Sequence, residues 1–183
     1  ESGYAITDGH DNVFVGAAAG VGTDNIGYAT VIGRSAMRGV ATAAADGTVA
    51  VGYQALKDLT SGAGNVAIGL DAGKNITTGS YNTVVGHLAG DAFATNTHHN
   101  TAVGYQALSA CNTSGDSRNV AVGSGAGLLL TSGSDNVFVG KSAGDELLTG
   151  TGNVAIGHQA FHAADADESD NICIGNYAGD SID

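Results

Sequence analysis

Apolar residues recur along this chain in a short pattern that appears ten times. In each copy three apolar or β-branched residues precede a glycine, as in Val66-Ala67-Ile68-Gly69, and an alanine stands three residues after that glycine. The ten closing glycines are Gly16, Gly33, Gly52, Gly69, Gly86, Gly104, Gly123, Gly140, Gly157 and Gly175. Because they recur every 17 to 19 residues, the sequence predicts one structural unit stacked on copies of itself. We call each unit a rung and number its positions from the closing glycine.

Positions −3 to −1 of every rung predict a short β-strand. Position −1 is Val or Ile, and position −3 is Val, Ile or Thr, so β-branched residues recur with period two. Position −2 is Phe, Val, Ala or Cys and is never polar. Successive strand residues point to opposite faces, so both faces of the strand are apolar. Parallel strands have this pattern, and we predict an all-β fold, a parallel β-roll or β-solenoid of about ten 17–19-residue repeats.

The two apolar faces of the strand must have different surroundings in a coil. We place positions −1 and −3 inside, packed against the alanine of position +3 on a return strand, and position −2 outside. An outer stripe of ten apolar residues is of the kind that marks an interface. We therefore expect the strands to meet partners, most simply identical copies in a closed oligomer.

Polar and small residues around the strand indicate how the chain turns. Position −4 is Asn in eight of the ten rungs, which predicts a stacked asparagine ladder. The closing glycine is expected at a bend that needs a positive φ or a close backbone approach. Segments such as Thr60-Ser61-Gly62 and Thr131-Ser132-Gly133 carry turn chemistry and vary in length, which predicts loops on the outside of the coil.

Position +4 adds a longer period. From Leu56 onward it reads large, Gly, Gly, and the large residues Leu56, Leu108 and Phe161 recur every third rung. They follow the dipeptides Tyr53-Gln54, Tyr105-Gln106 and His158-Gln159. Duplication of a three-rung block accounts for this period more simply than a single chain that builds a pseudo-threefold body.

Composition supports one repeat array over residues 1–183, with repeat phrases from about residue 12 to residue 179. The net charge of −12, with six Lys plus Arg, argues against nucleic acid and anionic membrane surfaces as partners. No apolar run approaches the ~20 residues that span a bilayer. Since the chain starts at Glu1 and not at Met, we expect a processed product or a fragment.

The sequence carries few candidates for chemistry. Tyr53, Tyr105 and His158 are candidates for stacking on sugars, although packing between rungs or chains explains them more simply. No cofactor, metal site or catalytic residue is expected, because nothing places a nucleophile beside a base. Cys111 and Cys173 lie more than three rungs apart, so we expect no disulfide between them.

Metal binding has three weak candidates. A calcium roll needs an aspartate directly after the Gly-x-Gly-Asn phrase, but that position is Val, Thr or Ile in every rung. The pair His98-His99 lacks further ligands, and the acidic cluster is typical of a solvated loop. That cluster consists of Asp165, Asp167, Glu168 and Asp170. Ice binding would need a flat array of threonines, whereas most threonines here fall in turns.

The phrases Asn65-Val66-Ala67-Ile68-Gly69 and Asn153-Val154-Ala155-Ile156-Gly157 resemble the Hep/Hag-type repeats of trimeric autotransporter adhesin heads. They are also similar to repeats in the shafts of phage-type tail fibre proteins. The resemblance spans about residues 12 to 179 and implies a trimeric, left-handed β-roll. The adhesin repeat is nearer fourteen residues, so the longer rungs of this chain leave cross-section and handedness open. The repeat is scaffold, and the resemblance implies no binding residues.

These observations together predict a non-enzymatic structural or adhesive fibre segment on a cell or virion surface. Its expected partner is itself, as a homotrimer, and adjacent domains would contact a cell-surface glycan or receptor. The alternative is a self-sufficient monomeric β-solenoid that binds glycan or assembles end to end into an extracellular filament.

Overall fold

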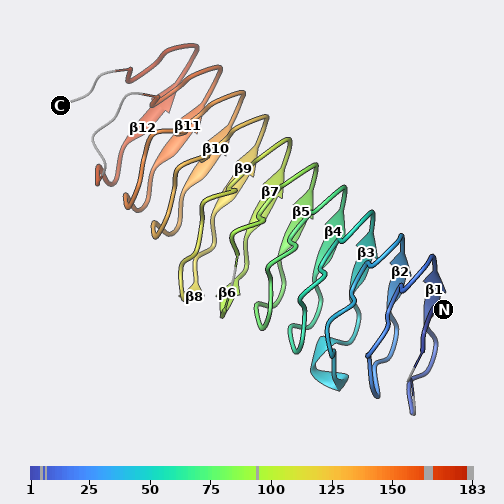
Figure 1. Ribbon diagram of the computed structural model, residues 1–183. Helices are drawn as coiled ribbons and strands as arrows, with labels where there is room; N and C mark the ends of the chain where they lie inside the picture. Colours follow the sequence, from blue (N-terminus) through green and yellow to red (C-terminus); the bar gives the residue numbers. More distant parts are fainter. Residues whose placement is uncertain (5, 7, 94, 163–166, 181–183) are drawn as a thin grey trace.

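A computed structural model shows an elongated rod built from ten stacked parallel β-strands (Figure 1). It describes residues 1–183 except 5, 7, 94, 163–166 and 181–183. The strands follow one another in chain order, so the predicted β-solenoid is confirmed. They are β1 (Val13–Val15), β2 (Thr30–Ile32), β3 (Val49–Val51), β4 (Val66–Ile68), β5 (Thr83–Val85), β7 (Thr101–Val103), β9 (Val120–Val122), β10 (Val137–Val139), β11 (Val154–Ile156) and β12 (Ile172–Ile174).

Every strand pairs with its neighbours without a shift in register. Val66 of β4, for example, lies between Val49 of β3 and Thr83 of β5. Differences in rung length are therefore absorbed by the loops on the other side of the coil. The short helix η1 (Ala43–Ala45) and the strand β8 (Gly115–Asp116) lie in the two 19-residue rungs, and β8 pairs with β6 (Thr97–His98).

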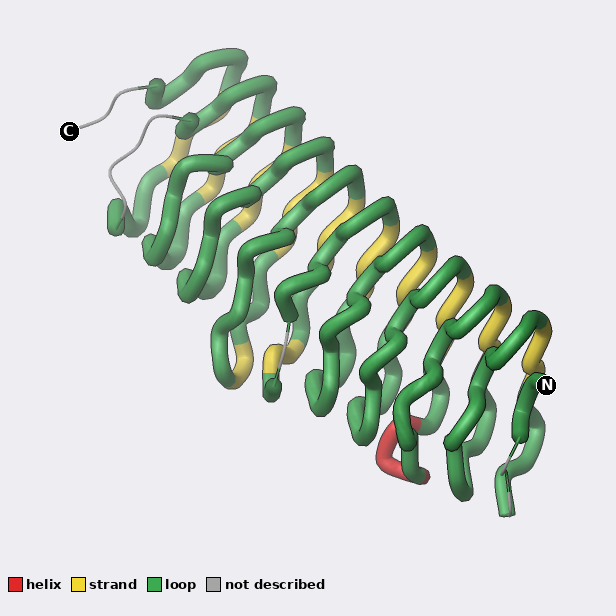
Figure 2. The backbone as a smooth tube through the Cα atoms, in the orientation of Figure 1, coloured by secondary structure: helices red, strands yellow, loops and turns green. Residues whose placement is uncertain are grey.

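The side of the coil that follows the closing glycine is a turn and not a second strand (Figure 2). The prediction of a return strand is therefore wrong. Positions +2 and +4 have positive φ in every rung, as at Gln54 (56°) and Leu56 (50°). Two left-handed residues separated by one other residue curl the chain away from the extended form. Rungs still bond to one another on this side, because the Leu56 N–H donates to the Ala72 carbonyl at 3.0 Å.

The interior is lined by position −2 of the strand and by the alanine at position +3. Ala67 and Ala72 are both fully buried, as are their equivalents in most rungs. The inward position of the alanine column is confirmed, but the prediction for the strand is wrong: −1 and −3 face outward and −2 faces inward. The asparagine at −4 explains this orientation, because it turns inward and therefore −2, two residues later, turns inward as well.

Large and small side chains alternate across this interior. Phe138 at −2 shares its rung with Gly144 at +4, where an added Cβ would lie 2.5 Å from the phenyl ring. Ala155 at −2, by contrast, shares its rung with Phe161 at +4. In these two rungs the two positions together hold one large residue, whereas in the rungs of Ala67 and Ala121 both positions are small, so packing within a rung does not by itself explain the three-rung period. A third buried column, missed from the sequence, comprises Leu59, Ile76, Phe93, Cys111, Leu130 and Leu147.

Seven asparagines from Asn65 to Asn171 form the predicted ladder inside the coil. From Asn82 onward, the backbone N–H of each donates to the Oδ1 of the preceding asparagine, as from Asn136 to Asn119 at 3.0 Å. The side-chain amide of Asn119 donates to the Gly133 carbonyl at 2.8 Å. The ladder thus satisfies backbone groups that are buried where the chain enters each strand.

The closing glycines meet both requirements predicted for them. Gly69 has a φ of 138°, and an added Cβ would lie 2.7 Å from the carbonyl oxygen of Gly86. Backbones of successive rungs approach too closely at this corner for any side chain.

Candidate functional site

The outer face of the sheet consists of positions −3 and −1 of all ten rungs. Val13, Ile68 and Ile174 on this face are 49%, 41% and 65% exposed, and the other members are at least partly exposed. Seventeen of the twenty residues are Val or Ile, and the others are Thr30, Thr83 and Thr101. The predicted apolar stripe therefore exists, but it has two columns of β-branched residues and not one.

Two further exposed columns border the outer face. The leading column is position −5, where the chain approaches the strand, and the trailing column is position +1, where it leaves the closing glycine. The leading column contains Asp11, Tyr28, Gly47, Gly64, Tyr81, His99, Arg118, Asp135, Gly152 and Asp170. The trailing column contains Ala17, Arg34, Tyr53, Leu70, His87, Tyr105, Ser124, Lys141, His158 and Asn176. Nearly all of these residues are exposed, and none is buried.

The structure places all three predicted sugar-stacking residues in the trailing column but does not bring them together. Tyr53 and Tyr105 lie three rungs apart, and so do Tyr105 and His158, which is roughly 14 Å at the spacing of β-strands. Each contacts a side chain of an adjacent rung. The centroid distances are 6.0 Å from the Arg34 guanidinium to Tyr53, 5.5 Å from His87 to Tyr105, and 5.3 Å from Tyr177 to His158.

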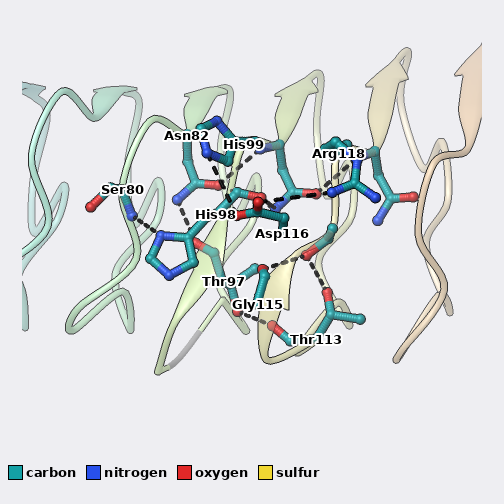
Figure 3. Close-up of polar contacts among 12 residues, drawn as sticks. Ser80, Asn82, Thr97, His98, His99, Thr113, Gly115, Asp116 and Arg118 are labelled. Carbon is teal, nitrogen blue, oxygen red and sulfur yellow. Dashed lines mark hydrogen bonds and ion pairs between the residues drawn. The ribbon is translucent and has the colours of Figure 1, made fainter.

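The leading column carries a row of interacting polar and aromatic side chains, and Figure 3 shows its members His99 and Arg118 with Asp116 beside them. The rings of Tyr81 and His99 stack at 5.2 Å with an interplanar angle of 15°. The carboxylate of Asp116 lies 3.6 Å from His99 and 3.9 Å from Arg118. Arg118 donates two hydrogen bonds to Asp135, at 2.6 and 2.8 Å, which lower the pKa of that carboxyl. Most of the charged and hydrogen-bonding groups in this row therefore interact with side chains of adjacent rungs in the same chain.

Cations gather at position +5 of three consecutive rungs, as Arg38, Lys57 and Lys74. An open depression is lined by Arg38, Gly39, Lys57 and Asp58. Within it the Lys57 ammonium lies 2.8 Å from the Asp58 carboxylate. One net positive charge remains, which is too little to select an anionic ligand.

An ion pair occupies the same position near the C-terminal end. The Nδ1 of His162 lies 2.6 Å from Oδ1 of Asp145, and its Nε2 lies 3.9 Å from Glu146. The hydrogen bond to Asp145 raises the pKa of His162.

Among the residues that the structure describes, no group of three or more His, Cys, Asp or Glu could hold a metal ion. Nδ1 of His98 accepts a hydrogen bond from the Ser80 N–H at 3.0 Å, and His99 belongs to the stacked row. Asp165 of the acidic cluster lies outside the described residues. The described part of the chain also contains no helix suited in length and hydropathy to cross a membrane.

Both cysteines are free and buried, in agreement with the sequence. Burial raises the pKa of the Cys111 thiol and of the Cys173 thiol. Cys111 belongs to the third buried column. Neither thiol is poised for nucleophilic chemistry.

The chain matches no protein-family model, no curated protein and no solved structure.

Proposed function

We propose that this chain is a non-enzymatic segment of an extracellular fibre, on a cell or virion surface, that assembles as a homotrimer and presents a binding region carried elsewhere. The observation that carries the proposal is the unbroken outer face of β-branched residues, which runs the whole length of the rod. The resemblance of the rung phrase to adhesin-head and tail-fibre repeats supports the same conclusion.

The size of the face suits association. Ten rungs at the ~4.8 Å spacing of strands are about 48 Å long, and the distance between the bordering columns is roughly 20 Å. The resulting area is on the order of 900 Å², similar to the ~800 Å² that each partner contributes to a standard interface. Ordinary monomer surfaces rarely expose an apolar patch of that extent.

The mechanism of such a segment is mechanical. Parallel backbone ladders and the buried asparagine ladder link every rung to the next, so bending or local opening must break several bonds together. Closure of three outer faces on one another would remove the apolar residues from water. The product is a stiff and protease-resistant spacer.

Measurement of solution mass by light scattering tests the proposal directly. We expect a single species near three times 17.9 kDa that persists on dilution. A well-folded monomer at all concentrations would exclude an assembled fibre segment.

The alternative is a monomeric solenoid that binds glycan or assembles end to end. It is favoured by five consecutive exposed residues of the trailing column, Arg34, Tyr53, Leu70, His87 and Tyr105. Aromatic rings in such a line suit stacking on an extended saccharide. A glycan array in which Tyr53→Ala and Tyr105→Ala abolish binding, while Tyr28→Ala in the leading column does not, would support this alternative.

A further inference from the structure

In five of the ten rungs, a small residue in one of these two columns shares its rung with a larger residue in the other. All three glycines of the leading column share their rung with a large trailing residue. These pairs are Gly47 with Tyr53, Gly64 with Leu70, and Gly152 with His158. The two smallest trailing residues, Ala17 and Ser124, share their rungs with larger leading residues, Asp11 and Arg118. Three other rungs have a large residue in both columns: Tyr28 with Arg34, Tyr81 with His87, and His99 with Tyr105.

Charges in the two columns are compatible in every rung. Lys141 of the trailing column shares its rung with Asp135 of the leading column. The leading cation Arg118 shares its rung with Ser124 and never with the trailing cations Arg34 and Lys141. No rung combines like charges at its two corners.

Within one chain, Gly64 and Gly152 are also kept small by the next rung, because Tyr81 and Asp170 occupy the space of an added Cβ. Gly47 has no such neighbour, and contact between the two corners of one rung explains none of the pairs. The two corners of a rung are six residues apart across a strand, which separates them by roughly 15–20 Å. The contacts that both columns make run to adjacent rungs, as from Tyr81 to His99 and from Arg34 to Tyr53. Side chains on opposite corners of the same rung do not touch.

Association of copies about an axis parallel to the rod would bring these corners together. Such an axis keeps each rung at the height of the same rung in the neighbouring copy, and it sets the trailing edge of one copy against the leading edge of the next. An antiparallel arrangement would instead set the first rung against the last, and the matched pairs would be lost.

We propose that the two columns form a register code, in which the trailing edge of each copy meets the leading edge of its neighbour rung for rung. This inference rests on the proposed assembly and specifies its contacts. Tyr53 of one copy lies over Gly47 of the next, and Lys141 lies beside Asp135. The partner is therefore a second copy in parallel and in register.

Gly47 offers the sharpest steric test. It is exposed, an added Cβ meets no atom within 4 Å, and its φ of 70° is close to the 58° and 59° of Tyr28 and Tyr81 in the same column. Gly47→Tyr therefore fits the single chain but should collide with Tyr53 of the neighbour. We expect assembly to weaken by about tenfold or more, with the circular dichroism spectrum unchanged.

Two controls separate this collision from general damage. Gly125→Tyr introduces the same residue at position +2, where Tyr177 already has a positive φ, and should leave assembly unchanged. Adding Tyr53→Ala to Gly47→Tyr should restore assembly, whereas adding Tyr105→Ala, three rungs away, should not.

A cysteine pair gives an independent measurement. Asp135→Cys combined with Lys141→Cys cannot form a disulfide within one chain, because the two positions are too far apart. Mild oxidation should link neighbouring copies, and the largest covalent species counts the copies in the ring. Lys141→Cys combined with His99→Cys, two rungs out of register, should not cross-link.

The outcomes distinguish the two proposals. A wild-type chain that stays monomeric overturns the proposed assembly and the register code together. A wild-type chain that assembles, while Gly47→Tyr assembles equally well or only the out-of-register cysteines cross-link, overturns the register code alone.

Discussion

The inner and outer faces of one three-residue strand have almost the same apolar character but opposite environments. In β4, Ala67 is fully buried, while Ile68 beside it is 41% exposed. The inner face varies in size, from Ala to Phe, and each phenylalanine there is accommodated by a glycine at position +4 of the same chain. The outer face is nearly uniform Val and Ile and has no such counterpart within the chain.

The comparison teaches that hydrophobicity alone does not locate the core of a solenoid. A residue that packs inside must match the volume opposite it, whereas a residue on a repetitive face must match its neighbours in adjacent rungs. The inner face is therefore recognised by compensated variation, and the outer face by uniformity.

The strongest test of this comparison introduces one charge on each face of β4. Ala67→Asp would bury a carboxylate without a partner and should reduce the free energy of unfolding by roughly 4 kcal/mol or more. Val66→Asp, directly beside it, should reduce it by only about 1 kcal/mol but should abolish assembly. Urea denaturation and light scattering measure the two effects, and equal destabilisation by both variants would contradict the assignment of the faces.

A smaller effect is expected from overfilling the alanine column. Ala72 is fully buried opposite the strand, so Ala72→Leu should cost about 1–3 kcal/mol of stability through displaced neighbours. Ala44→Leu adds the same carbons at an exposed position of η1, outside the outer face and its two bordering columns, and should change the unfolding midpoint little. A midpoint unchanged by Ala72→Leu would show that the interior is not close-packed.

The asparagine ladder should contribute a comparable or smaller amount. Asn119→Ala removes the acceptor of the Asn136 N–H and the donor to the Gly133 carbonyl, which leaves buried groups unpaired at about 1–3 kcal/mol. Thermal melting compares this variant with Asn112→Ala at an exposed loop position. If both variants have the same melting temperature, water replaces the hydrogen bonds of the ladder with little loss of stability.

The smallest expected effect is a pH dependence of stability that arises from His162 and Asp145 near the C-terminal end. Because Asp145 raises the pKa of His162 in the folded chain, this pair stabilises the fold fully below the ordinary His pKa of about 6.5. The stabilisation is lost as pH rises through the raised pKa, and less than about 1 kcal/mol is expected for a pair this close to the surface. Melting of wild type and His162→Gln should therefore differ more at pH 6 than at pH 8. If the two melting temperatures differ equally at pH 6 and pH 8, the interaction of His162 with Asp145 does not contribute to stability.

Much of the fold could be predicted from the sequence because the repeat is regular. The strands, their parallel stacking, the bend at the closing glycine and the asparagine ladder all follow from position-specific residue types, as at Gly69 and Asn119. The turn found in place of the expected return strand could not be predicted, because the residue types of Gln54 and Leu56 do not indicate a positive φ. The candidate site was found in part: Tyr53, Tyr105 and His158 share one exposed column, but the matching column of position −5 was overlooked.

By itself, the sequence determined the period, the position of each strand and the apolar character of both strand faces, because these depend on local residue types that recur ten times. Only the tertiary structure decided which face is inside. That choice depends on how the chain turns at the corners: the inward asparagine at −4 sets the side on which −2 lies, and the left-handed residues at +2 and +4 bring the alanine column opposite it. The same turns expose the outer face and set its two bordering columns beside it.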